Sequence, residues 1–138
     1  MQYSRISLKE AIKFHGHLGP YLVLGILAGE LAIKKLRCKK HFGLDVKVWG
    51  ANKKPKSCLI DGLQLSTGAT YGKGNIHKLN SNKIRILIRN LVNNKKIKIS
   101  LNKGLIKRLD ELKGHKDSEA LAKELYLTCP SEIFVLIT

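Results

Sequence analysis

The chain has 138 residues, 43% of them hydrophobic, which is enough for one buried core and predicts one domain, residues 1–138. The 26 lysines and arginines outnumber the 10 acidic residues, so the net charge of +16 would attract anionic partners. The lysines are dispersed along the chain and only 6% of the residues are aromatic, so a nucleic-acid partner is not expected.

The cysteines and the apolar runs indicate in which cellular compartment the protein is expected. The three cysteines are an odd number without a CxxC pair, which argues against a disulfide framework and against a zinc ribbon. The first 13 residues are charged and do not resemble a signal peptide. The longest uncharged run, residues 18–29, is shorter than the about 20 residues that span a bilayer. We therefore expect a cytoplasmic protein with no membrane partner.

A short helix is predicted from Ser7 to Phe14. Ser7 can cap it, and Glu10 follows three residues later as in a capping box. The run His15-Gly16-His17-Leu18-Gly19 should end this helix, because glycine is a poor helix former.

A long second helix is predicted from Pro20, which suits a first helical turn, to about Lys39. Small residues recur on one face of this helix, where they would let another backbone approach closely. They are Gly25, Ala28, Gly29 and Ala32. The expected neighbour is either the helix that begins at Cys58 or a second copy of the chain.

The remaining chain predicts strands followed by helices. Alternating apolar residues predict strands at Leu44–Val48, Ile84–Ile88 and Ile97–Leu101, with a last short strand at Ile133–Ile137. The predicted helices are Cys58 to about Leu65 after Ser57, a helix capped by Asn102 to about Leu112, and one capped by Asp117 to about Leu127. This order favours an α+β fold, a single compact domain with a small, mostly antiparallel sheet packed against the long N-terminal helix and the C-terminal helices.

Two histidines stand at the break between the first two helices. His15 and His17 are two residues apart, so both rings can point inward only from an irregular segment. The positive end of the following helix favours neutral imidazole, the form that binds a metal or accepts a proton. The alternative is that one ring bonds to the backbone and the other is exposed.

The helix that begins at Cys58 carries a second polar group. Cys58, Asp61 and Gln64 follow at intervals of three and share one face. A thiol in the first helical turn is placed where the helix dipole stabilises a thiolate. The alternative is a small buried cysteine, with Asp61 capping a nearby backbone.

A glycine-rich segment, residues 68–75, follows this helix. Gly68-x-x-x-Gly72-Lys73-Gly74 is one residue too short for a phosphate-binding loop, lacks its Ser/Thr, and follows a helix instead of a strand. This excludes nucleotide hydrolysis. Lys73 and the loop amides could still bind a carboxylate or phosphate, or the segment is a structural turn.

These two motifs resemble a known family. The first motif is the run Phe14-His15-Gly16-His17-Leu18-x-Pro20. The second is the run Cys58-x-x-Asp61-Gly62-x-Gln64-x-x-Thr67-Gly68-x-Thr70-x-Gly72-Lys73-Gly74-Asn75. Both are similar to signatures of FmdE, a family of formylmethanofuran dehydrogenase subunits. The resemblance implies an α+β core, often dimeric, with a metal site at the histidines and the cysteine. It also implies archaeal or anaerobic one-carbon metabolism of the methanogenesis type.

The resemblance implies roles for particular residues. The expected metal ligands are His17, Cys58 and His15, and imidazole with thiolate suits zinc, with nickel or iron left open. Cys58, His15 and Asp61 are the expected catalytic residues, and Gln64, Lys73 and Asn75 the expected substrate-binding residues. Many members have cysteine where this chain has Gly19 and Ala69, so a thiolate-rich redox centre is not expected. The C-terminal zinc finger of some members is not expected either.

Three functions remain open at the level of sequence. The first is a metal-dependent enzyme or accessory protein that acts on a small anionic substrate. The second is a non-catalytic subunit of a molybdenum or tungsten formylmethanofuran dehydrogenase. The third, nucleic-acid binding, rests on charge alone.

Overall fold

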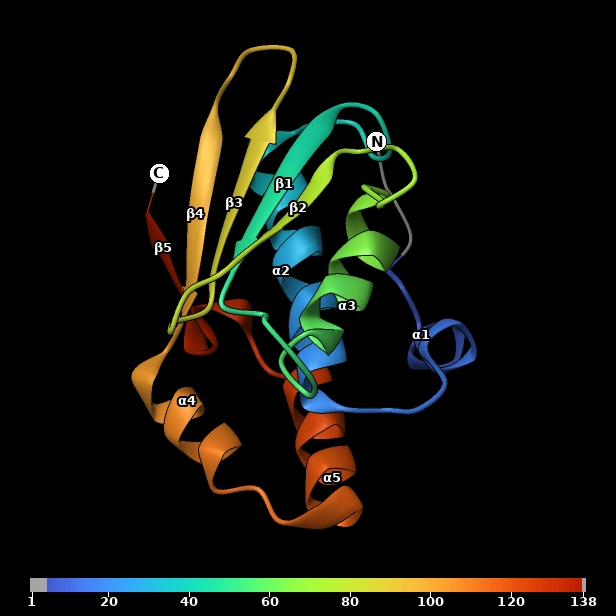
Figure 1. The fold of residues 1–138 in the computed structure, drawn as a ribbon, viewed down its shortest axis with the longest axis vertical. Helices are drawn as coiled ribbons and strands as arrows, with labels where there is room; N and C mark the ends of the chain where they lie inside the picture. Colours follow the sequence, from blue (N-terminus) through green and yellow to red (C-terminus); the bar gives the residue numbers. More distant parts are fainter. Residues whose placement is uncertain (1–4, 138) are drawn as a thin grey trace.

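The computed structural model describes residues 5–137, which form a two-layer α+β domain (Figure 1). The helices are α1 (Leu8–His15), α2 (Pro20–Leu36), α3 (Cys58–Thr67), α4 (Lys103–Asp110), α5 (Gly114–Tyr126) and a 3-10 turn, η1 (Pro130–Glu132). The strands are β1 (Leu44–Trp49), β2 (Ile76–Leu79), β3 (Arg85–Asn90), β4 (Lys96–Leu101) and β5 (Phe134–Ile137).

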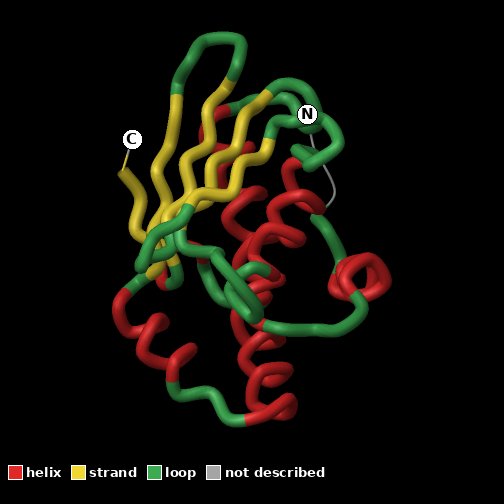
Figure 2. Tube along the Cα trace, viewed as in Figure 1, coloured by secondary structure: helices red, strands yellow, loops and turns green. Residues whose placement is uncertain are grey.

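The five strands form one sheet in the order β2-β1-β3-β4-β5, drawn in yellow in Figure 2. Only β1 and β2 run parallel, and the other three pairs are antiparallel. Alternate side chains of β1, β3 and β4 are fully or almost fully buried. They include Val46, Val48, Ile86, Ile88, Ile97 and Ile99. The α+β class and the mostly antiparallel sheet are therefore confirmed.

Helices α2 and α3 cover this buried face of the sheet (Figure 1). A Cβ atom added at Gly25 of α2 would lie 2.2 Å from the carbonyl oxygen of Leu59, and one added at Gly62 of α3 would lie 2.1 Å from that of Leu22. The hydroxyl of Ser66 in α3 donates to the carbonyl of Gly25 at 3.1 Å. The small-residue face of α2 thus packs against α3, which was one of the two neighbours predicted.

The remaining helices lie around these two layers. Helix α5 packs on α2, and α4 lies beyond the end of β4, below the sheet in Figure 1. Helix α1 lies outside α3, and the segment before it is held to α5 by the Tyr126 hydroxyl, which donates to the carbonyl of Ile6 at 2.7 Å. Within residues 5–137, no helix combines the length and the hydropathy needed to cross a membrane.

Local sequence signals explain most of the element ends. The Ser7 hydroxyl accepts from the Glu10 amide at 3.1 Å, as the capping box predicts, and the Asn102 side chain accepts from the Leu105 amide at 3.2 Å. Each of these caps satisfies an amide that the helix itself leaves free.

Two local predictions were wrong, and one strand was missed. Ser57 makes no capping hydrogen bond, because it already has helical backbone angles. Helix α5 begins at Gly114, so Asp117 lies inside its first turn, where the carboxylate still faces the positive end of the helix. Strand β2 was missed, because its short sequence Ile-His-Lys-Leu has no sustained alternation and pairs with β1 only through tertiary structure.

Candidate metal centre

His15, His17 and Cys58 come together at one end of the helical layer. One ligand atom from each residue lies within 4.8 Å of the other two. His15 ends α1, Cys58 begins α3, and His17 lies in the connection that leads to α2. The structure therefore places the two histidines and the cysteine beside one another, as a shared site requires.

The connection between α1 and α2 takes the shape that this cluster needs. Gly16 has a φ of 105°, in the left-handed region that favours glycine, and its amide donates to the carbonyl of Ile12. The chain therefore turns sharply between the two histidines, and their ring centroids lie 4.7 Å apart. Pro20 then starts α2 at the next residue after Gly19.

Asp61 orients one of the two imidazoles. The Nδ1 atom of His15 lies 2.5 Å from the Oδ2 atom of Asp61, and the side chain of His15 is only 10% exposed. An ionised carboxylate can only accept, so Nδ1 carries a proton, and in the neutral ring Nε2 then keeps its lone pair. That Nε2 atom is buried and has no hydrogen-bond partner in the part of the chain described. A buried imidazole nitrogen without a partner, with its ring fixed by a carboxylate, is the usual arrangement of a metal-binding histidine.

The Cys58 thiol has a pKa above the ordinary value. Burial is the larger cause, and the nearby carboxylate of Asp61 adds to it, while Lys54 opposes both. The helix dipole therefore does not make Cys58 a thiolate without a metal. An ion that binds here must displace the thiol proton.

The cluster fits a tetrahedral ion. Zinc with ligands at about 2.0–2.3 Å places neighbouring ligand atoms about 3.3–3.8 Å apart, so the three side chains need to close by about 1.5 Å at most. His17 is exposed and can rotate, whereas Asp61 holds His15 in place. Three ligands would leave one coordination position open, as in catalytic zinc sites.

The predicted substrate residues lie along α3 and beyond its far end. Gln64 is hydrogen-bonded to Asp61 at 3.5 Å and accepts from the Tyr71 amide. The Asn75 side chain accepts from the Thr70 amide and donates to two carbonyls, so it holds the glycine-rich turn together. The ammonium group of Lys73 lies 5.6 Å from the centre of the exposed Phe42 ring. Of these three residues, only Gln64 touches the group around Cys58.

Lysines before α3 were missed as neighbours of the site. Lys54 acts electrostatically on the Cys58 thiol, and Lys56 precedes that thiol by two residues. The run Lys53-Lys54-Pro55-Lys56 was visible in the sequence as the nearest concentration of charge. It was overlooked because a run of lysines in a loop usually only faces solvent.

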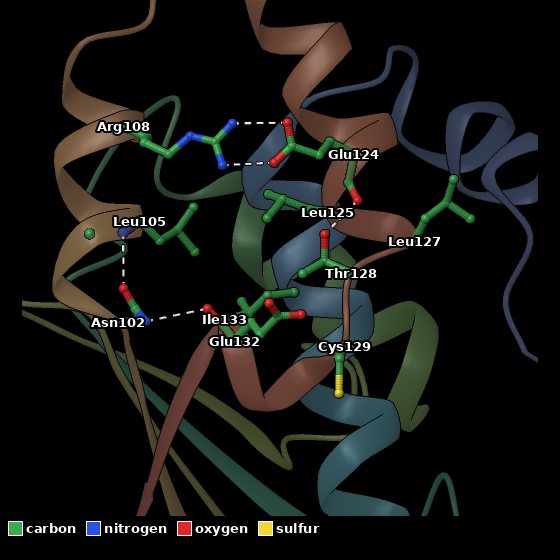
Figure 3. Close-up of a pocket in the computed structure, with 11 residues that line it drawn as sticks. Asn102, Leu105, Arg108, Glu124, Leu125, Leu127, Thr128, Cys129, Glu132 and Ile133 are labelled. Carbon is green, nitrogen blue, oxygen red and sulfur yellow. Dashed lines mark hydrogen bonds and ion pairs between the residues drawn. The ribbon is translucent and has the colours of Figure 1, made fainter.

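A separate cleft lies between α4, α5 and the segment after α5 (Figure 3). Its volume is about 710 Å³ and Cys129 lies on its wall. Figure 3 shows Arg108 reaching across the cleft to Glu124, with which it makes two hydrogen bonds of 2.7 and 2.9 Å. The Asn102 side chain accepts from the Leu105 amide as the cap of α4 and donates to the carbonyl of Glu132. The side chains of Arg108, Glu124 and Asn102 thus already have partners within this part of the fold.

Comparison with known families shows to which family the chain belongs. Residues 14–134 match the family described as "FmdE, Molybdenum formylmethanofuran dehydrogenase operon". The chain belongs to the FmdE family. The match begins one residue before His15 and covers the whole candidate site.

A solved FmdE-like structure shares the fold. It is the crystal structure of an FmdE-like protein, described as related to tungsten formylmethanofuran dehydrogenase, from Syntrophus aciditrophicus. The TM-score is 0.68, with 23% identity over 94% of this chain and 68% of that one. The similarity supports the α+β architecture described above.

A curated relative is similar over a shorter stretch. A "Probable S-adenosyl-L-methionine-binding protein" of Archaeoglobus fulgidus is 32% identical over 85 residues, which is 59% of this chain. The chain spans only 22% of the length of that relative.

Gly19 and Ala69, the two departures from the family pattern, occupy different surroundings. A Cβ atom at Gly19 would lie 3.5 Å from the Cε1 atom of His17, so a side chain there would adjoin the metal cluster. Ala69 is fully buried just beyond the C-terminal end of α3, the end opposite Cys58. Of the two positions, only Gly19 adjoins the metal cluster, so a cysteine at that position would add a side chain to the site.

Proposed function

We propose that this FmdE-family protein binds one divalent metal ion, with zinc as the first candidate, through His15, His17 and Cys58. We further propose that it acts in the cytoplasm on a small anionic substrate, in one-carbon metabolism connected with formylmethanofuran dehydrogenase. The family match supports the metabolic setting. The side-chain geometry supports the metal.

The observation that carries the proposal is the state of His15. Burying a ring nitrogen without a partner costs free energy, about 1–3 kcal/mol for a lost hydrogen bond. This chain buries Nε2 while it uses Nδ1 to bind Asp61. A metal ion at Nε2 removes the cost, because the lone pair then has a partner. The nearby Cys58 and His17 supply the further ligands.

Each residue then has a defined task. Asp61 holds the Nδ1 proton of His15 and so fixes the ring. Gln64 in turn donates to Asp61 and limits the rotation of that carboxylate. Lys54 offers positive charge beside the thiol and favours the approach of an anion. A bound ion with one open position would supply a Lewis acid that polarises an oxygen of the substrate.

Metal analysis tests the proposal directly. Protein produced without a histidine tag, with its native sequence, is expected to hold about one divalent ion per chain. The Cys58→Ser variant is expected to lose that ion, because a hydroxyl is a far weaker ligand than a thiolate. Cys129→Ser is the matched control, since Cys129 is exposed and lies in the cleft of Figure 3, away from the cluster. Native protein that stays empty and takes up no added zinc would refute the proposal.

A second candidate is a non-catalytic subunit of a larger dehydrogenase. Two aromatic side chains on neighbouring loops favour a partner surface: Phe42 is 77% exposed and Tyr71 is 89% exposed. The small-residue face of α2 no longer supports this candidate, because α3 covers it. Co-purification from the native source distinguishes the two candidates. A chain that is isolated without other subunits, either alone or only as a homodimer, would argue against the second candidate.

A further inference from the structure

We infer that the chain carries a binding pocket for a small polyanion with an apolar body, at a place distinct from the histidines and Cys58. The pocket has a volume of about 550 Å³, within the usual range of small-molecule sites. It lies where β3 begins and β4 ends, against α4, at the lower end of the sheet in Figure 1. The inference concerns binding alone and does not require a metal.

Positive charge is concentrated on the wall of this pocket. Four cations line it against a single carboxylate, that of Asp110. They are Lys56, Lys83, Arg85 and Lys103. None of the four forms an ion pair with another residue in the range 5–137. The guanidinium of Arg85 lies 5.2 Å from the centre of the Trp49 ring, a cation–π contact that supplies no negative charge. Cations gathered in a hollow attract an anion more strongly than the same cations spread over a convex surface.

The cleft in Figure 3 differs from this pocket in the pairing of its charged side chains. There Arg108 points at Glu124 and is neutralised by two hydrogen bonds. In the basic pocket the charges come from the β1–α3 loop, the segment before β3, β3 itself and the start of α4, and they have no such partner.

The same pocket has apolar walls that remain open to solvent. Ile106 of α4 is 40% exposed and Val135 of β5 is 51% exposed, and Ile84 lies between charged neighbours. Apolar side chains beside unpaired cations suit a ligand that has both an apolar part and a charged part. An inorganic anion would leave these side chains in water.

The pocket continues toward the candidate metal centre. Tyr21, Lys56 and Asp110 also line an adjoining hollow of about 330 Å³, together with Pro20 and Pro55. Pro20 follows His17 by three residues, and Lys56 precedes Cys58 by two. A ligand anchored by its charged end in the basic pocket therefore lies on the side of the molecule where α2 and α3 begin (Figure 1).

Calorimetry with three probes tests the pocket on metal-free protein. ADP carries charge and a ring, pyrophosphate carries charge alone, and adenosine carries a ring alone. We expect ADP to bind at least about tenfold more tightly than either of the other two. Pyrophosphate that binds as tightly as ADP, or a failure of all three to bind, would overturn the inference.

A pair of double variants separates the pocket from the overall charge. Lys83→Gln with Lys103→Gln is expected to weaken ADP binding about tenfold or more, because two charge-assisted contacts are lost. Lys95→Gln with Lys96→Gln, at the end of the β3–β4 turn and the exposed start of β4, removes the same charge and is expected to leave the affinity within about twofold. Equal weakening in both would show attraction by net charge only and would also overturn the inference. All four lysines are exposed, so folding is unaffected, and unchanged thermal unfolding of each variant verifies this.

Discussion

Gly62 of α3 lies against Gly25 of α2 so closely that a Cβ atom at Gly62 would be 2.8 Å from the Cα atom of Gly25. This contact sets the distance between the two helices. Helix α3 carries Cys58 and Asp61, while α2 follows directly on the connection that contains His17. The glycine pair therefore decides whether the side chains of the candidate metal centre can meet.

The first prediction concerns this helix contact. Gly62→Ala is expected to lower the free energy of unfolding by about 2–3 kcal/mol, because the added methyl group meets the Leu22 carbonyl at 2.1 Å. The clash outweighs the about 1 kcal/mol that alanine gains in a helix. Urea unfolding measures the change. Gly72→Ala is the control, since its nearest neighbour would be 4.0 Å away, and an equal loss in both variants would contradict the explanation.

The second prediction concerns the carboxylate that orients His15. Asp61→Ala is expected to weaken zinc binding about 10–100-fold, because the imidazole loses the partner of its Nδ1 proton. Competition with a chelator measures the affinity. Asp45→Ala is a matched control, because Asp45 bonds to His77 at 2.9 Å and neither residue belongs to the cluster. Unchanged affinity in the Asp61 variant would show that the His15–Asp61 pair is only structural.

The third prediction adds a ligand. Gly19→Cys is expected to tighten zinc binding about tenfold or more, because a fourth side-chain ligand would close the open position. The backbone of Gly19 is extended, with a φ of −143°, so a side chain is tolerated there, and its Cβ atom would face the His17 ring. Gly19→Ala controls for the added bulk. If the cysteine and alanine variants bind zinc equally well, position 19 does not reach the ion.

The fourth prediction concerns Asn90, a buried polar side chain at the end of β3. Its amide donates to the Leu36 carbonyl at 3.0 Å and its oxygen accepts from the Val92 amide at 2.9 Å. Asn90→Ala is expected to cost about 1–3 kcal/mol, because the Leu36 carbonyl at the end of α2 loses its partner. Asn93→Ala, at an exposed position in the same turn, should cost about 0.5 kcal/mol. Chemical denaturation compares the two, and similar losses would contradict the role given to Asn90.

The fifth prediction concerns stability at high pH. Burial, and then the charge of Asp110, raise the pKa of Tyr21 from 10.0 to about 12. The folded chain thus holds this proton more tightly than the unfolded chain, so the stabilisation is complete below pH 10 and is lost as the pH rises toward 12. Tyr21→Phe has no such proton and should lose less stability over this interval. Parallel decline of the two unfolding free energies would show that Tyr21 does not contribute.

The lengths and caps of most elements follow from local sequence. Ser7 with Glu10, Pro20, and Asn102 act within one helical turn, so their effect can be recognised without a structure. The alternation in β1, β3 and β4 likewise shows which side chains are buried. Strand β2 could not be found this way, because four residues at a sheet edge become a strand only when a neighbour pairs with them.

The candidate site was predictable as a set of residues but not as a geometry. The spacing of the histidines and of Cys58 with Asp61 singled out the candidate ligands, and the family resemblance joined the two motifs. The sequence did not distinguish Gln64, which reaches Asp61, from Asn75, whose side chain holds a turn. Gln64 and Asn75 are both amides of the same motif, so only the hydrogen bonds seen in the structure show that their roles differ.

By itself, the sequence determined the chemical types at the site: two imidazoles before a helix, a thiol in a first turn and a carboxylate one turn later. Tertiary structure alone decided that His15 and Cys58, over forty residues apart, meet and that the Nε2 atom of His15 is buried without a partner. It alone gathered cations from four segments around one pocket. The physical reason is that local signals act over a few residues, whereas these arrangements depend on how closely α2 and α3 pack and on where the sheet ends.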